Sequence, residues 1–171
     1  IIIGGGRIGR TLAERLENRG EFVVIVEDDE TNLELARDSG FTVHSGDGTE
    51  TTVLREAGIE DAKMVVAATG NDNDNLLVCQ LAASKFDIEN VYARVNQLGN
   101  AEAFDSLNVT AIDAPMATAL AIDNEIERPA LAHWMNELGE GHDVQEIEVT
   151  AGDLVDKTIA ELNTVLPDGC I

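Results

Sequence analysis

The chain has 171 residues and a formal net charge of −22 at pH 7, because 33 aspartates and glutamates face only 11 lysines and arginines. A chain of this length buries a sizeable core, and an apolar fraction of 44% is that of an ordinary globular protein. The charge excludes a basic patch for nucleic acid and disfavours contact with an anionic membrane. No apolar run approaches the ~18 residues that span a bilayer. We therefore expect no nucleic-acid partner and no direct membrane insertion.

The acidic residues are scattered along the chain and predict a solvated surface. Their mutual repulsion weakens at molar salt, where the Debye length is about 3 Å. With few lysines and few aromatics, this composition favours a salt-adapted, halophilic protein of the cytoplasm; an acidic surface on a mesophilic protein is the alternative. Cys79 and Cys170 lie far apart in the sequence without other ligands at metal-binding spacing. They predict a reducing compartment, with neither a disulfide framework nor a metal site.

Along the chain, apolar strands alternate with helices. Strands are predicted at 1–4, 22–28, 41–48, 63–70, 90–96 and 109–113, and helices at 7–20, 30–40, 49–59, 73–86 and 98–108. In the first helix, Ile8, Leu12 and Leu16 fall on one face and Gly20 ends the helix. Continuous apolar strands separated by helices indicate a parallel sheet covered on both faces. The right-handed crossover rule then predicts an α/β fold, a Rossmann-like doubly wound parallel sheet of six strands, over residues 1–113.

The pattern changes after residue 113. Residues 114–141 predict a crossover helix that Pro129 kinks or breaks. This stretch carries more apolar side chains than one exposed helix should, which favours a partner; packing back onto the sheet is the alternative. Residues 142–171 predict a half-exposed strand, a short helix and a turn, too little to close a core alone. We interpret them as part of a second small α/β subdomain.

The first strand runs directly into a glycine turn. Gly4, Gly6 and Gly9 form G-x-G-x-x-G between a strand and a helix. In such a motif one glycine permits the tight turn, one lets the backbone approach a pyrophosphate, and one lets the helix pack on the strand. The helix N-terminus offers free N–H groups and positive potential to phosphates, and Arg7 adds a cation. The motif alone is a weak signal.

A carboxylate strengthens the case for a dinucleotide. Glu27 lies at the carboxyl end of the second strand, 18 residues after Gly9, where a carboxylate accepts hydrogen bonds from adenosine ribose hydroxyls. Asp28 and Asp29 follow, so a 2′-phosphate would meet three negative charges. The sequence therefore favours NAD(H), or another adenine nucleotide with a free 2′-hydroxyl, over NADP(H).

Three further strand ends point to the same crevice. Asp47, in the segment 46–49, is placed to meet the adenine amino group, and the backbone of 68–75 to follow the phosphates and the second ribose. Arg94 is a cation within an apolar strand, which favours an anionic partner; a surface ion pair is the alternative.

The ordered set "GGGRIG", "VVIVEDD", "GDGT", "AATGNDNDNLL" and "YARVN" resembles the RCK (KTN, TrkA N-terminal) family, cytosolic nucleotide-binding regulators of potassium uptake systems and channels. "AIDAP" is similar to the last core strand and the start of the crossover helix of that family. "IEVTAGDLVDKTIAEL" is similar to the opening of its TrkA-C subdomain, with Asp156 at a usual glycine position.

The resemblance implies a homodimer or higher homo-oligomer that binds NAD(H), with ATP or ADP as alternatives. It also implies a cytoplasmic regulator at the inner face of the membrane, where a nucleotide-dependent rearrangement gates a membrane potassium transporter or channel. The ligand residues that it implies are Gly4, Gly6, Arg7, Ile8, Gly9, Glu27, Asp28, Asp47, Gly48, Thr49, Thr69, Gly70, Asn71, Asn75 and Arg94.

A small NAD-dependent oxidoreductase is the alternative function. Hydride transfer to a carbonyl usually needs a general acid beside the nicotinamide. Tyr92 has Asn96, not lysine, four residues later, and His44 is expected on the adenosine side. The chain also has no room for a substrate domain. We therefore expect no catalytic residues and a nucleotide that is sensed rather than turned over.

Overall fold

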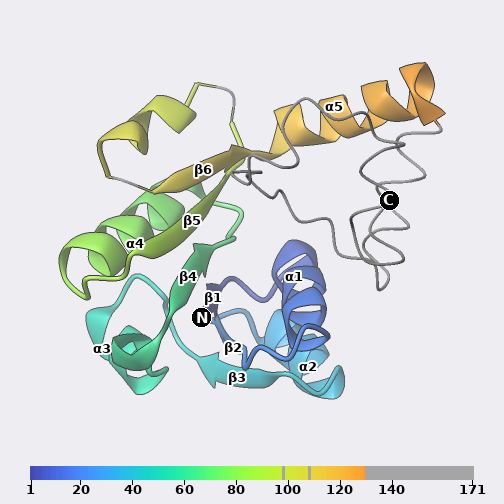
Figure 1. Cartoon of the computed structure of the whole chain (residues 1–171). Helices are drawn as coiled ribbons and strands as arrows, with labels where there is room; N and C mark the ends of the chain where they lie inside the picture. The colour runs from blue at the N-terminus through green and yellow to red at the C-terminus, as the bar shows by residue number, and fades with distance from the viewer. Residues whose placement is uncertain (98, 108, 130–171) are drawn as a thin grey trace, which may run out of the picture. The chain divides into compact units, whose positions relative to one another are not determined.

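The computed structural model describes residues 1–97, 99–107 and 109–129, and its centre is one parallel sheet of six strands (Figure 1). The strand order is β3-β2-β1-β4-β5-β6. The strands are β1 (Ile2–Ile3), β2 (Val24–Glu27), β3 (Thr42–Ser45), β4 (Met64–Ala67), β5 (Asn90–Val95) and β6 (Thr110–Asp113). The order reverses direction between β1 and β4, which is the doubly wound topology. The predicted fold is therefore confirmed.

Helices cover both faces of this sheet. α1 (Arg7–Glu17) and α2 (Glu30–Asp38) lie on one face, and α3 (Thr51–Glu56) and α4 (Asp72–Ser84) on the other (Figure 1). Short 3-10 helices lie at η1 (Ile59–Asp61), η2 (Ala101–Ala103) and η3 (Asp105–Leu107), and α5 (Ala114–Glu127) follows β6. No helix among the described residues is long and apolar enough to cross a bilayer.

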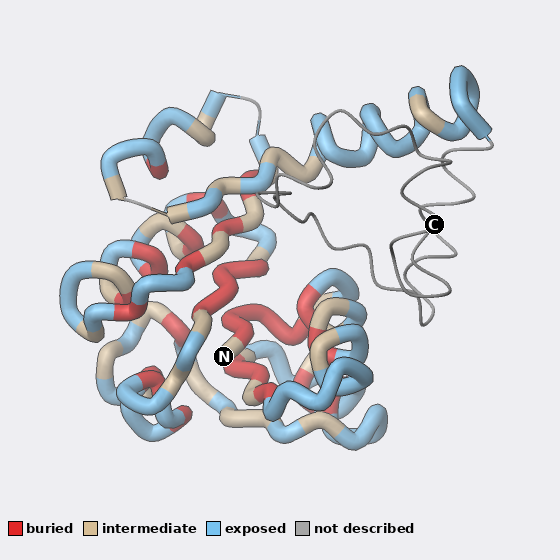
Figure 2. The backbone as a smooth tube through the Cα atoms, viewed as in Figure 1, coloured by how far each residue is buried: buried red, intermediate tan, exposed pale blue. Residues whose placement is uncertain are grey.

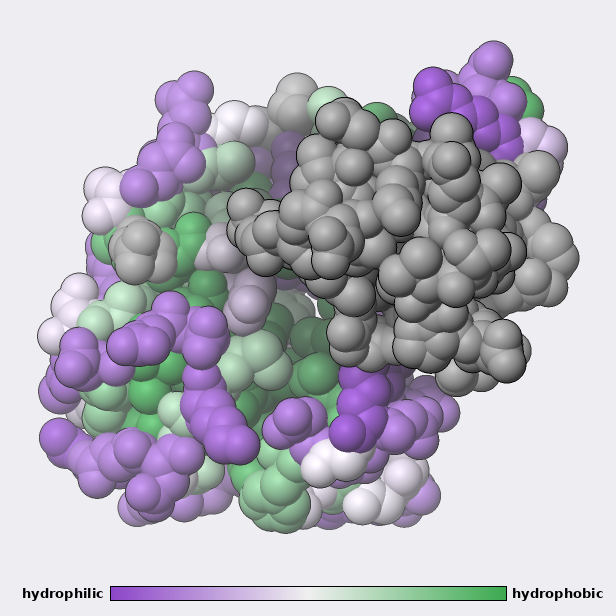
Figure 3. Space-filling model, viewed as in Figure 1, coloured by the Kyte–Doolittle hydropathy of each residue, from purple (hydrophilic) through white to green (hydrophobic). Residues whose placement is uncertain are grey.

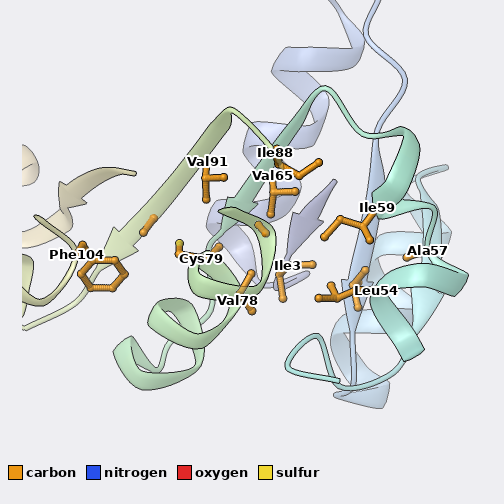
Figure 4. Close-up of a cluster of buried hydrophobic side chains, with 14 of the residues drawn as sticks. Ile3, Leu54, Ala57, Ile59, Val65, Val78, Cys79, Ile88, Val91 and Phe104 are labelled. Carbon is orange, nitrogen blue, oxygen red and sulfur yellow. The ribbon is translucent and has the colours of Figure 1, made fainter. Parts of the chain in front are cut away.

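The core is divided between the two faces because successive strand residues point in opposite directions. Ile2 packs in the cluster under α1 and α2, whereas Ile3 packs in the cluster under α3 and α4. Figure 4 shows the second cluster, in which Val65 of β4 and Val78 of α4 lie together. In Figure 2 the buried stretches follow the central strands. Continuous apolar strands are thus explained by burial on both sides.

The first helix packs differently from the amphipathic pattern. Leu12 and Leu16 contact the core, whereas Ile8, one turn earlier on the same face, is 43% exposed and lines the cleft described below. The buried positions of α1 are Gly9 and Ala13. A Cβ at Gly9 would lie 1.9 Å from the Gly4 carbonyl oxygen, so only glycine lets the helix come this close to the turn.

The predicted helix at 98–108 was also wrong. The described part of this segment forms the 3-10 helices η2 and η3. Gly99 has a left-handed φ of +96°, and the side chain of Asn100 donates to Asp72 across 28 positions of sequence. A left-handed residue and a competing long-range bond at its start prevent a continuous α-helix.

The chain after β6 begins with α5, which ends two residues before Pro129. This agrees with the predicted interruption, because a residue before proline disfavours the helical region. Residues 1–123 form one compact unit, and the end of α5 from Asn124 belongs to a second. The predicted second half of the crossover helix and the predicted strand and helix at 142–171 lie outside the described residues.

Candidate functional site

A cleft of about 460 Å³ lies at the carboxyl ends of the strands. The loops after β1, β2, β3 and β4 all line it, together with Arg94 of β5. The strand order reverses between β1 and β4, and the cleft lies at that point. In open α/β sheets this is where the crevice for a ligand forms.

The glycine turn closes one side of the cleft. Gly4 has φ +104°, a backbone conformation that L side chains avoid, and its N–H donates to the Val26 carbonyl (2.8 Å). Gly6 is the N-cap of α1, and a Cβ added there would meet nothing within 4 Å. The backbone at Gly6 is therefore open to a ligand. The first turn of α1 holds Arg7 and no acidic residue, so its N-terminus suits an anion.

Glu27, the last residue of β2, is held by backbone amides. Its Oε2 accepts a hydrogen bond from the Gly5 N–H (2.7 Å), and its Oε1 accepts from the N–H groups of Asp28 and Asp29 (3.0 Å each). The side chain is half-buried and lines the cleft. The structure thus fixes this carboxylate beside the glycine turn, where the sequence places the ribose.

Three carboxylates share this end of the cleft. Burial raises the pKa of Asp28 above its ordinary value, and the neighbouring Glu27 and then Asp47 raise it further. Asp47 itself accepts hydrogen bonds from the N–H (2.8 Å) and the hydroxyl (2.6 Å) of Thr49, which order the loop after β3. This end of the cleft is acidic and disfavours an additional phosphate.

On the other side of the cleft, Asn75 joins the loop after β4 to β5 from behind the lining. It is 0% exposed and does not line the cleft. Its Oδ1 accepts from the N–H (3.0 Å) and the hydroxyl (2.7 Å) of Thr69, and its Nδ2 donates to the carbonyls of Thr69 (3.2 Å) and Arg94 (2.8 Å). Asn75 therefore holds Thr69 and Arg94, two residues that line the cleft, in position.

A second buried polar residue, Asp72, lies one turn earlier on α4 and is 8% exposed. Its carboxylate accepts from the backbone and the side chain of Asn96 (2.7 Å each), the Gln97 N–H (3.0 Å) and the Asn100 side chain (2.7 Å). Burial by itself raises the pKa of Asp72, but these hydrogen bonds, led by that from Asn100, outweigh burial and hold the pKa below its ordinary value. Asp72 therefore ties the start of α4 to the chain after β5.

Arg94 is a cation at the floor of the cleft. It lies on β5, it lines the cleft, and its buried Nε atom has no hydrogen-bond partner among the described residues. The alternative role of Arg94, a surface ion pair with an acidic residue, is not found in the described part of the chain. Because a buried guanidinium N–H without a partner is costly, this atom is suited to an anionic or carbonyl group of a ligand.

Most of the residues expected at the site border one cleft. Those that line it are Gly4, Gly6, Arg7, Ile8, Glu27, Asp28, Asp47, Gly48, Thr49, Thr69, Gly70, Asn71 and Arg94. Gly9 and Asn75 lie behind this lining.

The sequence reasoning missed Asn32 and Asp74, which also line the cleft. Asp74 is in the first turn of α4, and the early acidic position on a helix after a strand is the signal that could have found it. The described residues hold no cluster of histidine, cysteine or acidic side chains arranged for a metal ion.

A family model of the TrkA-N domain matches residues 1–115, more than half of the chain. The chain belongs to the TrkA-N family. This TrkA-N chain is 34% identical over 168 residues to a Trk system potassium uptake protein TrkA homolog of Methanothermobacter thermautotrophicus, and the match covers 95% of this chain and 76% of that protein. The family resemblance stated from the sequence is thereby confirmed, although the predicted start of a TrkA-C subdomain is not shown.

Solved structures support the same fold. The TrkA-N domain of the inner membrane protein ybaL from Escherichia coli superposes with a TM-score of 0.67 at 19% identity, covering 74% of this chain and 94% of that one. The GsuK channel bound to NAD has a TM-score of 0.57 at 27% identity, covering 65% of this chain and 20% of that one. The first of these neighbours is a domain of an inner membrane protein and the second is a channel, although the Rossmann fold also occurs in oxidoreductases.

Proposed function

We propose that this TrkA-N domain binds NAD(H) in the cleft and regulates potassium transport. The observation that carries the proposal is the convergence of three features on one cleft: an open helix N-terminus at Gly6, a fixed carboxylate at Glu27 and a guanidinium at Arg94 whose buried Nε has no partner among the described residues. They suit the diphosphate, the adenosine ribose and the distal half of a dinucleotide, respectively. The relatives named for potassium uptake and the NAD-bound GsuK channel support this assignment.

The charges of the cleft assign the two ends of the nucleotide. The acidic end beside Glu27, Asp28 and Asp47 receives the adenosine, because ribose hydroxyls and the adenine amino group donate hydrogen bonds to carboxylates. The diphosphate lies at the α1 N-terminus with Arg7. A 2′-phosphate at the acidic end meets like charges, so NADP(H) binds more weakly than NAD(H). ATP and ADP remain alternatives because they share the adenosine and the diphosphate.

The lining of the cleft favours sensing over chemistry. In the described residues that border it there is no histidine, tyrosine, lysine or cysteine to serve as a general acid. His44 lies 3.6 Å from Glu56 on the edge of the sheet, and Tyr92 packs against the cluster under α1. Burial raises the pKa of the Cys79 thiol to about 12, which makes it a poor nucleophile. An oxidoreductase is therefore the weaker candidate.

A regulator of this kind acts through a change between two arrangements that bind the nucleotide unequally. We propose that the chain works as a homodimer or higher homo-oligomer in the cytoplasm, attached to the inner face of the membrane through a potassium transporter or channel subunit. The exposed apolar side chains on α5, among them Met116 (49% exposed) and Leu120 (55% exposed), support a protein partner on this helix.

Titration calorimetry in high salt tests the nucleotide site. We expect NAD⁺ and NADH to bind without reaction, and Glu27→Ala to weaken NAD(H) by about tenfold or more, because a charge-assisted hydrogen bond to the ribose is lost. Glu34→Ala, an exposed carboxylate on α2, is the matched control and should leave the affinity unchanged. ATP, ADP and NADP(H) serve as competitors.

Two results would contradict this proposal. An unchanged affinity in Glu27→Ala would place the ribose elsewhere. Consumption of NADH with simple carbonyl substrates would favour the oxidoreductase.

A further inference from the structure

The Glu27 carboxylate has almost no hydrogen-bonding capacity left for a ligand. An ionised carboxylate offers about four lone-pair positions, about two on each oxygen. The N–H groups of Asp28 and Asp29 fill both positions of Oε1, and the N–H of Gly5 fills one position of Oε2. One acceptor position on Oε2 therefore remains open, whereas a ribose carries two hydroxyls in this region.

The Gly5 contact is itself held from the opposite side. Arg10, in the second turn of α1, donates from Nη1 to the Gly5 carbonyl (2.5 Å) and reaches Asn32 Oδ1 on α2 (3.4 Å). Both backbone polar groups of Gly5 are thus occupied, one by a carboxylate and the other by a guanidinium. Arg10 is half-buried and does not line the cleft, so it acts on the site only through its neighbours.

We propose that Glu27 recognises a single ribose hydroxyl. Arg10 is the positioning residue: it holds the Gly5 N–H against Oε2 of Glu27, so that only one acceptor position stays open. This inference rests on the proposed function, because it requires the adenosine to lie at the acidic end of the cleft. If Arg10 is removed, Gly5 is free to leave Oε2, a second acceptor position opens, and the carboxylate can accept both hydroxyls.

The test compares ADP, 2′-deoxy-ADP and 3′-deoxy-ADP by calorimetry on the full chain in high salt. The pH is set at about 8, well above the ordinary carboxyl range, to favour ionised carboxylates at the acidic end of the cleft. For the unmodified chain, one deoxy analogue should lose about tenfold or more in affinity relative to ADP, and the other should stay within about threefold. In Arg10→Met the two analogues should become alike, because both hydroxyls then contact the carboxylate.

Two further variants separate positioning from simple destabilisation. Arg15→Met removes an exposed arginine from the same helix and should keep the difference between the analogues. Arg10→Lys retains a charged donor and should restore at least part of the difference between the two analogues. If Arg10→Met does not fold, Arg10→Leu, a second variant that removes the guanidinium, takes its place.

Equal losses for the two analogues in the unmodified chain would overturn the single-hydroxyl inference, as would equal retention. A difference that persists in Arg10→Met would remove the role of Arg10. If none of the three nucleotides binds, the proposed nucleotide site itself is wrong. That outcome can be told apart from failure of the single-hydroxyl inference, because in the latter case ADP still binds.

Discussion

At the scale of single residues, chemically similar carboxylates have different roles because their surroundings differ. Glu27 is half-buried and faces the cleft with one free acceptor position, whereas Asp72 is buried and fully engaged by neighbouring amides. The pKa of Asp28 is raised, first by partial desolvation and then by the neighbouring Glu27 and Asp47. Of these three carboxylates, only Glu27 combines a position fixed by backbone amides with access to the cleft. The number and direction of the donors around each carboxylate decide its role.

Asp72→Asn should destabilise the domain by about 2–3 kcal/mol at neutral pH, because an amide nitrogen would face donors that now meet a carboxylate. The pKa of Asp72 is lower in the folded chain than the ordinary aspartate value of 3.8. Its stabilisation is therefore complete above that value and is lost as the pH falls through the lower pKa of the folded state. Urea unfolding of both chains at several pH values, in one high-salt buffer, measures the difference.

Asp74→Asn is the matched control for this prediction, because Asp74 lies in the same helical turn and is only half-buried. It should change the free energy of unfolding by no more than about 0.5 kcal/mol. A loss in Asp72→Asn that stays constant down to the most acidic pH would show that the carboxylate charge is not the cause.

At the scale of elements, two helices that begin at the same edge of the sheet have opposite chemistry. The first turn of α1 has Arg7 and no acid, whereas the first turn of α4 has Asp72 and Asp74. Helix N-termini attract anions, but two carboxylates in the first turn of α4 offset this attraction. We therefore expect the phosphates of a ligand at α1, and hydroxyl and amide contacts from Thr69 and Asn71 in the loop that precedes α4.

The exposed helix α5 gives a prediction about assembly. Leu120→Glu places a charge among large apolar side chains that are exposed in the single chain, and it should shift a dimer toward monomer in light scattering, because burying an unpaired carboxylate is costly. Ala121→Glu adds the same charge on the side of the helix that carries alanines and should leave the dimer intact. A dimer that survives Leu120→Glu and is lost in Ala121→Glu would move the interface to the alanine side.

At the scale of the whole molecule, the surface is dominated by negative charge. The formal net charge is −22, and in Figure 3 hydrophilic residues cover much of the described surface on the visible face. The only ion pairs found among the described residues are Arg55 with Glu60 and the His44–Glu56 contact. Most acidic side chains there thus repel one another without compensation from a neighbouring cation.

Stability should therefore rise with salt. Between about 0.05 and about 1 M KCl the Debye length falls to about 3 Å and repulsion between surface carboxylates is screened. We expect the melting temperature to increase by several degrees in differential scanning calorimetry, because a change of about 1 kcal/mol moves it by about 2–8 °C. NaCl and tetramethylammonium chloride should act alike if screening is the cause. A flat or falling melting temperature would reject salt adaptation.

The sequence by itself determined the order of the elements, the parallel sheet and the glycine turn. These features depend on local signals: apolar runs, glycines at fixed spacing and an acid at a strand end, each set by residues close together in the chain. The positions of Glu27 and Arg94 at one cleft could be predicted in this way, because strand ends of a parallel sheet meet at one edge whatever the details of packing.

Only the tertiary structure decided how the side chains at that edge are used. It placed Asn75 behind the lining, exposed Ile8 and brought Asn96 and Asn100 to Asp72 from 24 and 28 positions away. It also showed that three of the acceptor positions of Glu27 are occupied by backbone N–H groups. Hydrogen bonds between distant residues leave no periodic signal in the sequence, because their geometry exists only after the sheet has brought the partners together.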